Sequence, residues 1–304
     1  MFGVTFFTFC LLNLLPGDTA EALLGDTATP KLIQALNVRL HLNQPFFDRY
    51  WHWLLPALHG NFGVSLANDQ AVSAVLKARL PVSLELVGLA FVLSIAFSIP
   101  VAALAAYRPK SAIDRVSLGL TGFGLSVPNF VYALVLILIL AVHEHVLPAY
   151  GFTPISGGLF ENLKSMTMPA GTIAFGLFCG YTRVLRGDMV DQLANEDYIV
   201  TARAKGVRPW QILIRHALRN SLFGLITLIG LNLGTLIGGT VIVEQIFALP
   251  GIGQELLASI NSRDVVVVEA IVTVIALAVV VSNLVVDLLY SVLDPRIRYG
   301  SRAS

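Results

Sequence analysis

The residues whose types and spacing suggest a working surface lie between Arg183 and Arg219. Within that segment, Asn195-Glu196-Asp197 offers a helix cap and acidic residues for a first turn. The next residues, Tyr198–Lys205, are expected to form a short helix. Arg203 and Lys205 fall near its end, where cations are favoured. Such residues can shape a docking surface, but they contain no group arranged to make or break bonds.

A tight turn is expected to follow this short helix. Gly206 is suited to the left-handed conformation that closes helices, and Pro209 is suited to the first position of a second helix. The small residues Ala202 and Ala204 would allow another surface to approach closely. From residue chemistry alone, the segment is either such a docking surface or a solvated basic connector.

No catalytic, metal or cofactor site is predicted. His143-Glu144-His145 lacks the H-E-x-x-H spacing that brings two histidines to one helix face, so an exposed loop is favoured over a metal site. The chain also contains no G-x-x-x-x-G-K-[ST] sequence that could cradle the phosphates of ATP. If ATP and Mg²⁺ are used, partner subunits must bind them.

The composition places these residues in a membrane protein. Of 304 residues, 56% are hydrophobic and 13% charged, against roughly 25% charged residues in soluble domains. The net charge of +1 gives no indication of nucleic-acid binding. A soluble enzyme and a disordered chain are excluded.

Uncharged stretches mark the elements that must position the working segment. A helix that crosses the ~30 Å hydrocarbon layer needs about 20 mostly apolar residues. The sequence predicts an all-α protein with six spans, at about 1–15, 82–106, 116–142, 167–185, 217–243 and 266–290. Span 1–15 would reach only about 22 Å at ~1.5 Å per residue, so we expect the true start of the protein to lie upstream.

The distribution of basic residues predicts the orientation. With both termini inside, thirteen of the twenty Lys and Arg residues are cytoplasmic, and seven of these lie in the segment 183–219. The predicted organisation is therefore a first helix with an external segment (1–80), a transmembrane domain (81–293) with a cytoplasmic loop (183–219), and a cytoplasmic tail (294–304).

The external segment 16–80 contains the aromatic cluster Tyr50, Trp51 and Trp53. This cluster is consistent with a helix at the membrane interface, where Trp and Tyr are enriched, or with a docking surface for a partner. Asn61–Ser65 is expected to form a turn before the second span.

The fifth predicted span carries Gly230, Gly234 and Gly238 on one face. This stripe favours close helix packing over a pore wall. Asn232, in the same span, and Asn283, in the sixth, are polar groups that are costly in lipid. We expect Asn232 to face a helix partner or a lumen.

Val200–Gly206 resembles the Glu-Ala-Ala-x-x-x-Gly loop of permease subunits in ABC importers, in the form found in the dipeptide and oligopeptide branch. The resemblance extends over nearly the whole chain, in order and on the expected sides of the membrane. Its other matching segments are Leu15–Asp18, Asn43–Pro45, Gly60–Ser65, Glu196–Tyr198, Leu218–Asn220, Leu249–Gly253 and Asp294–Tyr299. Val200, Thr201 and Arg219 depart from the general pattern, which has Glu, Ala and often Pro at these positions.

The resemblance implies a type I importer permease fold in a bacterial inner membrane. It also implies a second homologous permease, two ATP-binding subunits, either identical or different, and an external substrate-binding protein as partners. The loop around Gly206 would rest in a groove of an ATP-binding subunit and couple the movement of that subunit to the permease. The residues expected to contact that subunit or shape the loop are Asp197, Tyr198, Ala202, Arg203, Ala204, Lys205 and Gly206.

The resemblance leaves the substrate open. The same branch includes importers for dipeptides, oligopeptides, glutathione and nickel. A secondary transporter or a channel is the alternative class, although either would more often carry intramembrane acids or broken paired helices, which are not evident in the sequence.

Overall fold

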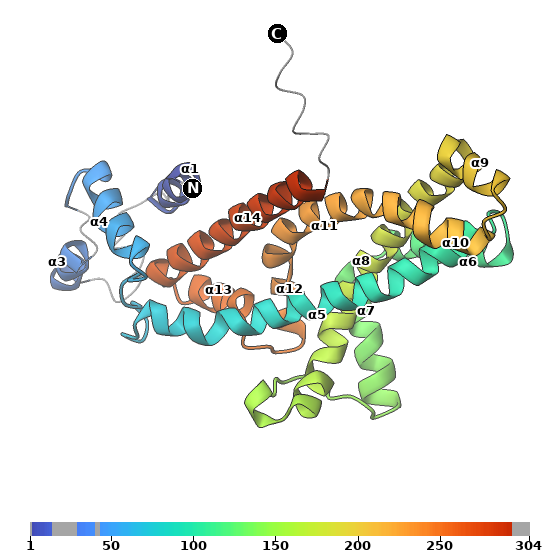
Figure 1. The fold of residues 1–304 in the computed structure, drawn as a ribbon. Helices are drawn as coiled ribbons and strands as arrows, with labels where there is room; N and C mark the ends of the chain where they lie inside the picture. The colour runs from blue at the N-terminus through green and yellow to red at the C-terminus, as the bar shows by residue number, and fades with distance from the viewer. Residues whose placement is uncertain (1, 14–28, 40–42, 294–304) are drawn as a thin grey trace, which may run out of the picture. The chain divides into compact units, whose positions relative to one another are not determined.

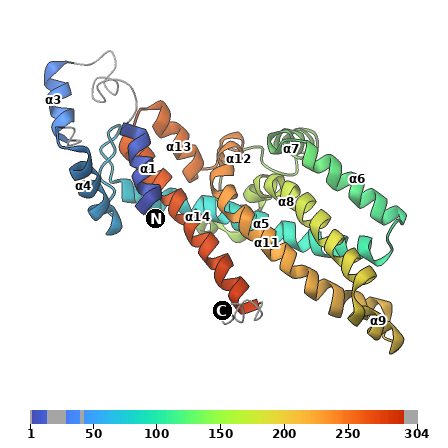
Figure 2. The same ribbon diagram turned by 90° about the horizontal axis from the view of Figure 1, so that it is seen from above.

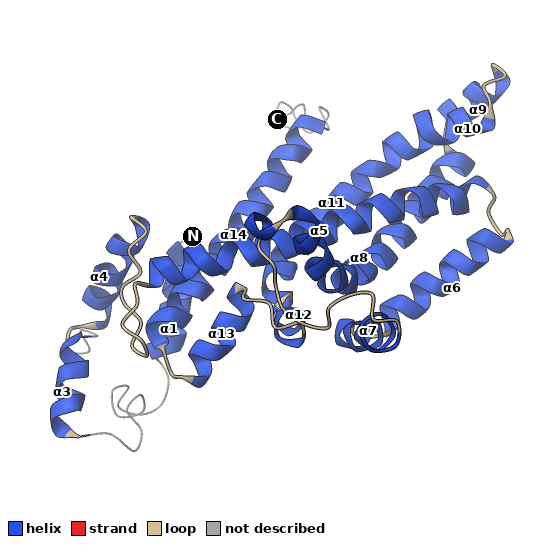
Figure 3. Ribbon diagram, turned by 90° about the horizontal axis from the view of Figure 1, so that it is seen from below, coloured by secondary structure: helices blue, strands red, loops and turns tan. Residues whose placement is uncertain are grey.

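The computed structural model describes residues 2–13, 29–39 and 43–293. Within these ranges the chain consists of helices and their connections, without a strand (Figures 1 and 3). The predicted all-α class is confirmed. The tail 294–304 and the Leu15–Asp18 segment lie outside the described residues.

Fewer helices than the six predicted spans meet the length and hydropathy required of a membrane span within the described residues. In the part of the chain described, three segments are long and apolar enough to span: Val72–Tyr107, Pro209–Leu233 and Val265–Val286. A fourth is added if the bent pair Ala112–Ser126 and Asn129–His143 counts as one span. Six spans and the inside location of both termini therefore stay predictions.

The third predicted span, 116–142, is not one continuous helix. Helix α6 (Ala112–Ser126) ends before Val127, and α7 (Asn129–Leu136) begins after Pro128 and continues as the π-helix η2 (Ile137–His143). The two halves are bent by 104°. The physical cause is Pro128, because a residue that precedes proline is disfavoured in the helical region, and Val127 is extended with φ −103° and ψ 131°.

The chain divides into two compact units, and the first comprises Met1–Val82 and Pro250–Val280. Its helices are α1 (Phe2–Asn13), α3 (Pro30–Arg39), α4 (Phe46–Leu58), α13 (Ile252–Asn261) and the beginnings of α5 (Val72–Tyr107) and α14 (Val265–Leu293). Phe9 of α1 packs against Tyr50 and Leu54 of α4, so part of the external aromatic cluster forms a core. The expected turn near Asn61–Ser65 is present, with Gly63 at φ +87°.

The second unit comprises Ser83–Leu249 and Val281–Ser304. Helix α8 (Leu159–Asn195) is its central element and packs against α6, α7 and α11 (Arg219–Gly239) (Figure 2). The unit also contains the 3₁₀ turn η3 (Ile155–Gly157), α9 (Asp197–Ala204), α10 (Pro209–Ile212), the π-helix η4 (Leu213–Leu218) and α12 (Val241–Ile246). Its core is formed mainly by α5, α8 and α11, with fully buried Tyr181, Leu185 and Met189 on α8.

Candidate functional site

The predicted helix, turn and second helix are present between α8 and α11. Helix α9 ends at Ala204, and Gly206 has φ +75°, the left-handed conformation expected for it. The Val207 amide donates to the Ala202 carbonyl oxygen at 3.1 Å, and the Gly206 amide donates to that of Arg203 at 2.9 Å. These two hydrogen bonds are those of a Schellman motif, so the backbone itself fixes the sharp turn.

The second helix of the loop begins as predicted, with Pro209 at the first position of α10. Arg208 is extended, with φ −60° and ψ 137°, as expected for a residue that precedes proline. The α10 helix leads through η4 directly into α11. The predicted side-chain cap at the start of α9 was wrong: no cap hydrogen bond is made there, and the Asn195 amide instead donates to Asp191 at 2.6 Å.

One face of α9 is fastened to the rest of the unit. Ile199 and Ala202 are buried with Ile212 of α10, and the partly buried Leu193 and Val207 pack against them. Ala202 therefore lies on the buried face of α9 and is not available for contact with a partner. The outward face is formed by exposed residues: Asp197, Val200, Thr201, Arg203, Ala204, Lys205 and Gly206.

Polar contacts attach α9 to its neighbours. The Tyr198 hydroxyl donates to Gln192 Oε1 of α8 and accepts a hydrogen bond from Asn220 Nδ2 of α11 at 2.8 Å. An Arg203 guanidinium nitrogen donates to the Leu193 carbonyl oxygen at 3.0 Å, near the end of α8. Tyr198 thus lies half-buried between the elements, whereas the sequence left open whether it contacts a partner or shapes the loop.

A buried ion pair joins α6 to α8 close to this loop. Arg186 Nε and one of its terminal nitrogens donate to the two carboxylate oxygens of Asp114, both at 2.8 Å. The Asp114 side chain is only 2% exposed, and the Lys110 amide also donates to it at 2.7 Å. The sequence counts Arg186 only among the basic residues of the segment 183–219 and gives it no partner. The structure supplies a bidentate partner 72 residues away in the sequence.

The pKa of Asp188, which lies one turn before Gln192 on α8, is also shifted by its surroundings. Burial, and secondarily the neighbouring Asp191 carboxylate, raise the pKa of Asp188 above its ordinary value. Its carboxylate lies against the backbone of Gly224 in α11: a Cβ atom at Gly224 would overlap Asp188 Oδ2. Helices α8 and α11 therefore approach closely beside the loop.

The residues predicted for the pathway lie on α11 and α14. A Cβ atom on Gly230 would be 2.5 Å from Val286 Cγ1, so α11 and α14 are in close contact at this point. Gly234 and Gly238 follow on α11, and Asn232 is half-buried there. Asn283 is exposed on α14. Their part in a pathway stays a prediction.

The sequence reasoning missed a buried carboxylate next to the fifth predicted span. Glu244 of α12 is fully buried, and its Oε1 accepts hydrogen bonds from Ser83 at 2.6 Å and Thr240 at 3.1 Å. The available signal was an acidic residue four positions after a threonine at the edge of a long apolar run. Its partner on α5 is distant in sequence and could not be identified.

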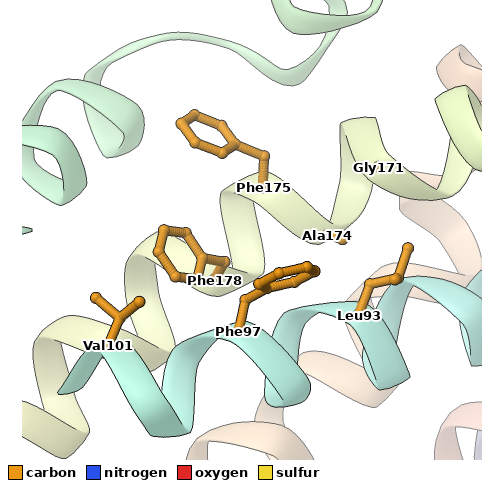
Figure 4. A pocket seen from close by; sticks show the side chains of 7 residues that line it. All are labelled: Leu93, Phe97, Val101, Gly171, Ala174, Phe175 and Phe178. Atoms are coloured by element: carbon orange, nitrogen blue, oxygen red, sulfur yellow. The ribbon is translucent and has the colours of Figure 1, made fainter. Parts of the chain in front are cut away.

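A hollow of about 300 Å³ lies between α5 and α8. Phe97 and Phe178 project toward it from the two helices (Figure 4). Its walls are apolar side chains and one glycine, so they offer a peptide no polar side chain. None of the predicted pathway residues lines it. The full lining is Leu93, Phe97, Val101, Gly171, Ala174, Phe175 and Phe178.

Comparison with known proteins places this architecture in a family. Residues 98–299 match the model of the binding-protein-dependent transport system inner membrane component, and residues 1–87 match the N-terminal model of the same group. The chain is 38% identical to the oligopeptide transport system permease protein AppB of Bacillus subtilis, over 98% of this chain and 95% of the relative.

Two other relatives are similar over comparable lengths. A probable peptide ABC transporter permease of Sinorhizobium fredii is 36% identical over 97% of this chain and 94% of its own length. The dipeptide transport system permease protein DppB of Escherichia coli is 33% identical over 98% and 94%, respectively. The chain therefore belongs to the family of binding-protein-dependent transport system inner membrane components, and it is a multi-pass permease subunit of a bacterial inner membrane, not a catalytic enzyme.

Proposed function

We propose that this chain is one of two homologous permeases that form the membrane pathway of an ATP-driven importer for di- or oligopeptides. An external binding protein delivers the substrate, and two ATP-binding subunits on the cytoplasmic side supply the energy. The relatives of this chain include a dipeptide and an oligopeptide permease, which supports the substrate class. The absence of a phosphate-binding loop sequence supports ATP and Mg²⁺ binding by the partners alone.

The observation that carries the proposal is the geometry of α9 and its turn. Ile199 and Ala202 pack the buried face of α9 against α10, and the left-handed Gly206 forms the turn that ends α9. Because α9 is packed against the rest of its unit, it can transmit a displacement, provided that the ATP-binding subunits bind it with different affinity in their two conformational states. The exposed Asp197, Arg203, Ala204, Lys205 and Gly206 are the proposed contacts, and Tyr198 and Ala202 shape the element.

The pathway is proposed to involve α11 and α14. Gly230 lies in close contact with Val286 of α14, and we propose that Gly234 and Gly238 on α11 extend this packing. Asn232 and Asn283 supply polar groups. These residues are assigned to helix packing or to the pathway wall.

The experiment is uptake of labelled peptide into proteoliposomes that contain the purified complex with the second permease and both ATP-binding subunits. Uptake should require ATP and the loaded binding protein. Uptake by this chain alone, without ATP, would contradict the proposal and indicate a secondary transporter or channel. Uptake of glutathione or Ni²⁺ but not of peptide would overturn the substrate class.

A further inference from the structure

The side chain of Tyr198 lies at the junction of three helices. It belongs to the first turn of α9, and its two hydrogen-bond partners are Gln192 in the last turn of α8 and Asn220 in the first turn of α11. In Figure 2, α9 lies beyond the ends of α8 and α11. The junction therefore connects the candidate docking helix with both helices that flank it in sequence.

The hydrogen bonds use the hydroxyl group in both of its roles. A tyrosine hydroxyl has one proton to donate and can accept hydrogen bonds as well. In this junction it donates to the Gln192 amide oxygen and accepts from the Asn220 amide nitrogen. Phenylalanine could fill the same space, but it would lose both links.

The other described contacts of α9 join it to the end of α8 and to α10. Arg203 holds the end of α8 through the Leu193 carbonyl oxygen, and Ile199 and Ala202 pack against Ile212 of α10. The Tyr198–Asn220 hydrogen bond reaches past α10 and η4 to the start of α11. It is a direct polar connection from α9 to a helix that contains part of a candidate membrane span.

We propose that Tyr198 is a positioning residue that passes a displacement of α9 to α8 and α11 together. This inference rests on the proposed function, because it assumes that ATP-binding subunits move α9. It assigns to Tyr198 a role inside this chain and not a contact with the partner.

The test compares Tyr198→Phe with the wild type in the complete complex in proteoliposomes. Two quantities are measured on the same sample: the rate of ATP hydrolysis with loaded binding protein, and the rate of peptide uptake. We expect the number of peptides imported per ATP to fall several-fold in Tyr198→Phe, while the amount of assembled complex and its ATP hydrolysis without substrate stay unchanged. A residue needed only for folding would instead lower assembly, hydrolysis and uptake together and leave the ratio constant.

A second variant identifies the partner. Asn220→Ala should lower the ratio as Tyr198→Phe does, and the double variant should be no worse than the more severe single variant, because both changes remove the same link. Tyr107→Phe is the matched control: its ring contacts Trp210 edge-on at 5.6 Å, and its hydroxyl makes no hydrogen bond with the described residues. This control should keep the wild-type ratio.

Three results would overturn the inference. They are a wild-type ratio in Tyr198→Phe, additive effects of the two single variants, and loss of the ATP-binding subunits from Tyr198→Phe during purification, which would make Tyr198 a contact residue. Failure of the proposed function would look different, because the wild-type complex itself would then import no peptide on ATP hydrolysis.

Discussion

The ion pair between Asp114 and Arg186 allows a quantitative prediction for Asp114→Asn. The amide keeps the size of the carboxylate but presents only one acceptor oxygen, so the two-pronged contact with the guanidinium is lost. The substitution also leaves Arg186 without a countercharge. Breaking a buried pair in this way costs about 3–5 kcal/mol. Because the Arg186 side chain is 19% exposed, we take the lower end, about 3 kcal/mol.

This loss should appear as local opening of the start of α6. Every 1.4 kcal/mol is a factor of ten in an equilibrium constant, so opening should become about a hundred times more frequent. The measurement is amide hydrogen exchange of peptides that cover residues 110–117 in the lipid-embedded complex, since local opening sets the exchange rate there. Peptides from α13 should exchange as in the wild type.

The control is Asp191→Asn, which removes an exposed carboxylate from the same end of α8. It should leave exchange at residues 110–117 unchanged. The double variant Asp114→Asn/Arg186→Gln should exchange more slowly than Asp114→Asn, because it removes the uncompensated charge. Equal exchange in Asp114→Asn and Asp191→Asn would refute the claim that this pair fastens α6 to α8.

Two further predictions concern helix contacts around α11. Gly230→Ala should destabilise the protein by about 1–3 kcal/mol, because the added methyl group would overlap Val286. Gly239→Ala on the same helix places its methyl group in open space and should leave the stability unchanged. Thermal unfolding in detergent measures both variants, and equal transition temperatures would contradict the close contact at Gly230. Asp188→Asn should be at least as stable as the wild type at pH 7. The raised pKa of Asp188 means that its ionisation weakens the folded state, so this group's contribution to stability falls as the pH rises from its ordinary pKa through its raised folded value. Unfolding scans at several pH values should show the advantage of the variant shrinking toward acid pH, and an advantage that grows there would refute the sign.

The sequence was most informative where structure depends on local rules. Gly206 and Pro209 predicted the turn between α9 and α10, and both adopt the expected conformations, since a left-handed glycine and a proline at the first helical position need no distant partner. The helical class followed equally directly from the uncharged stretches.

Contacts between distant residues could not be predicted in the same way. Nothing in a single sequence pairs Arg186 with Asp114 or Tyr198 with Asn220, because helix packing decides which side chains meet. The break at Pro128 was a different kind of error. Pro128 lies inside the apolar run from 116 to 142, and the length of that run alone predicts one continuous span and not the bend of 104°.

The most direct test of the account is the rate of ATP hydrolysis by the complete reconstituted complex that carries Gly206→Pro. Proline is confined to φ near −65°, whereas Gly206 has φ +75° and its amide donates to Arg203, so the substitution must rebuild the turn. The account predicts normal insertion of the chain into the membrane and loss of the hydrolysis that loaded binding protein stimulates. Wild-type stimulation, with normal peptide uptake, would contradict the claim that this loop couples the permease to its ATP-binding subunits.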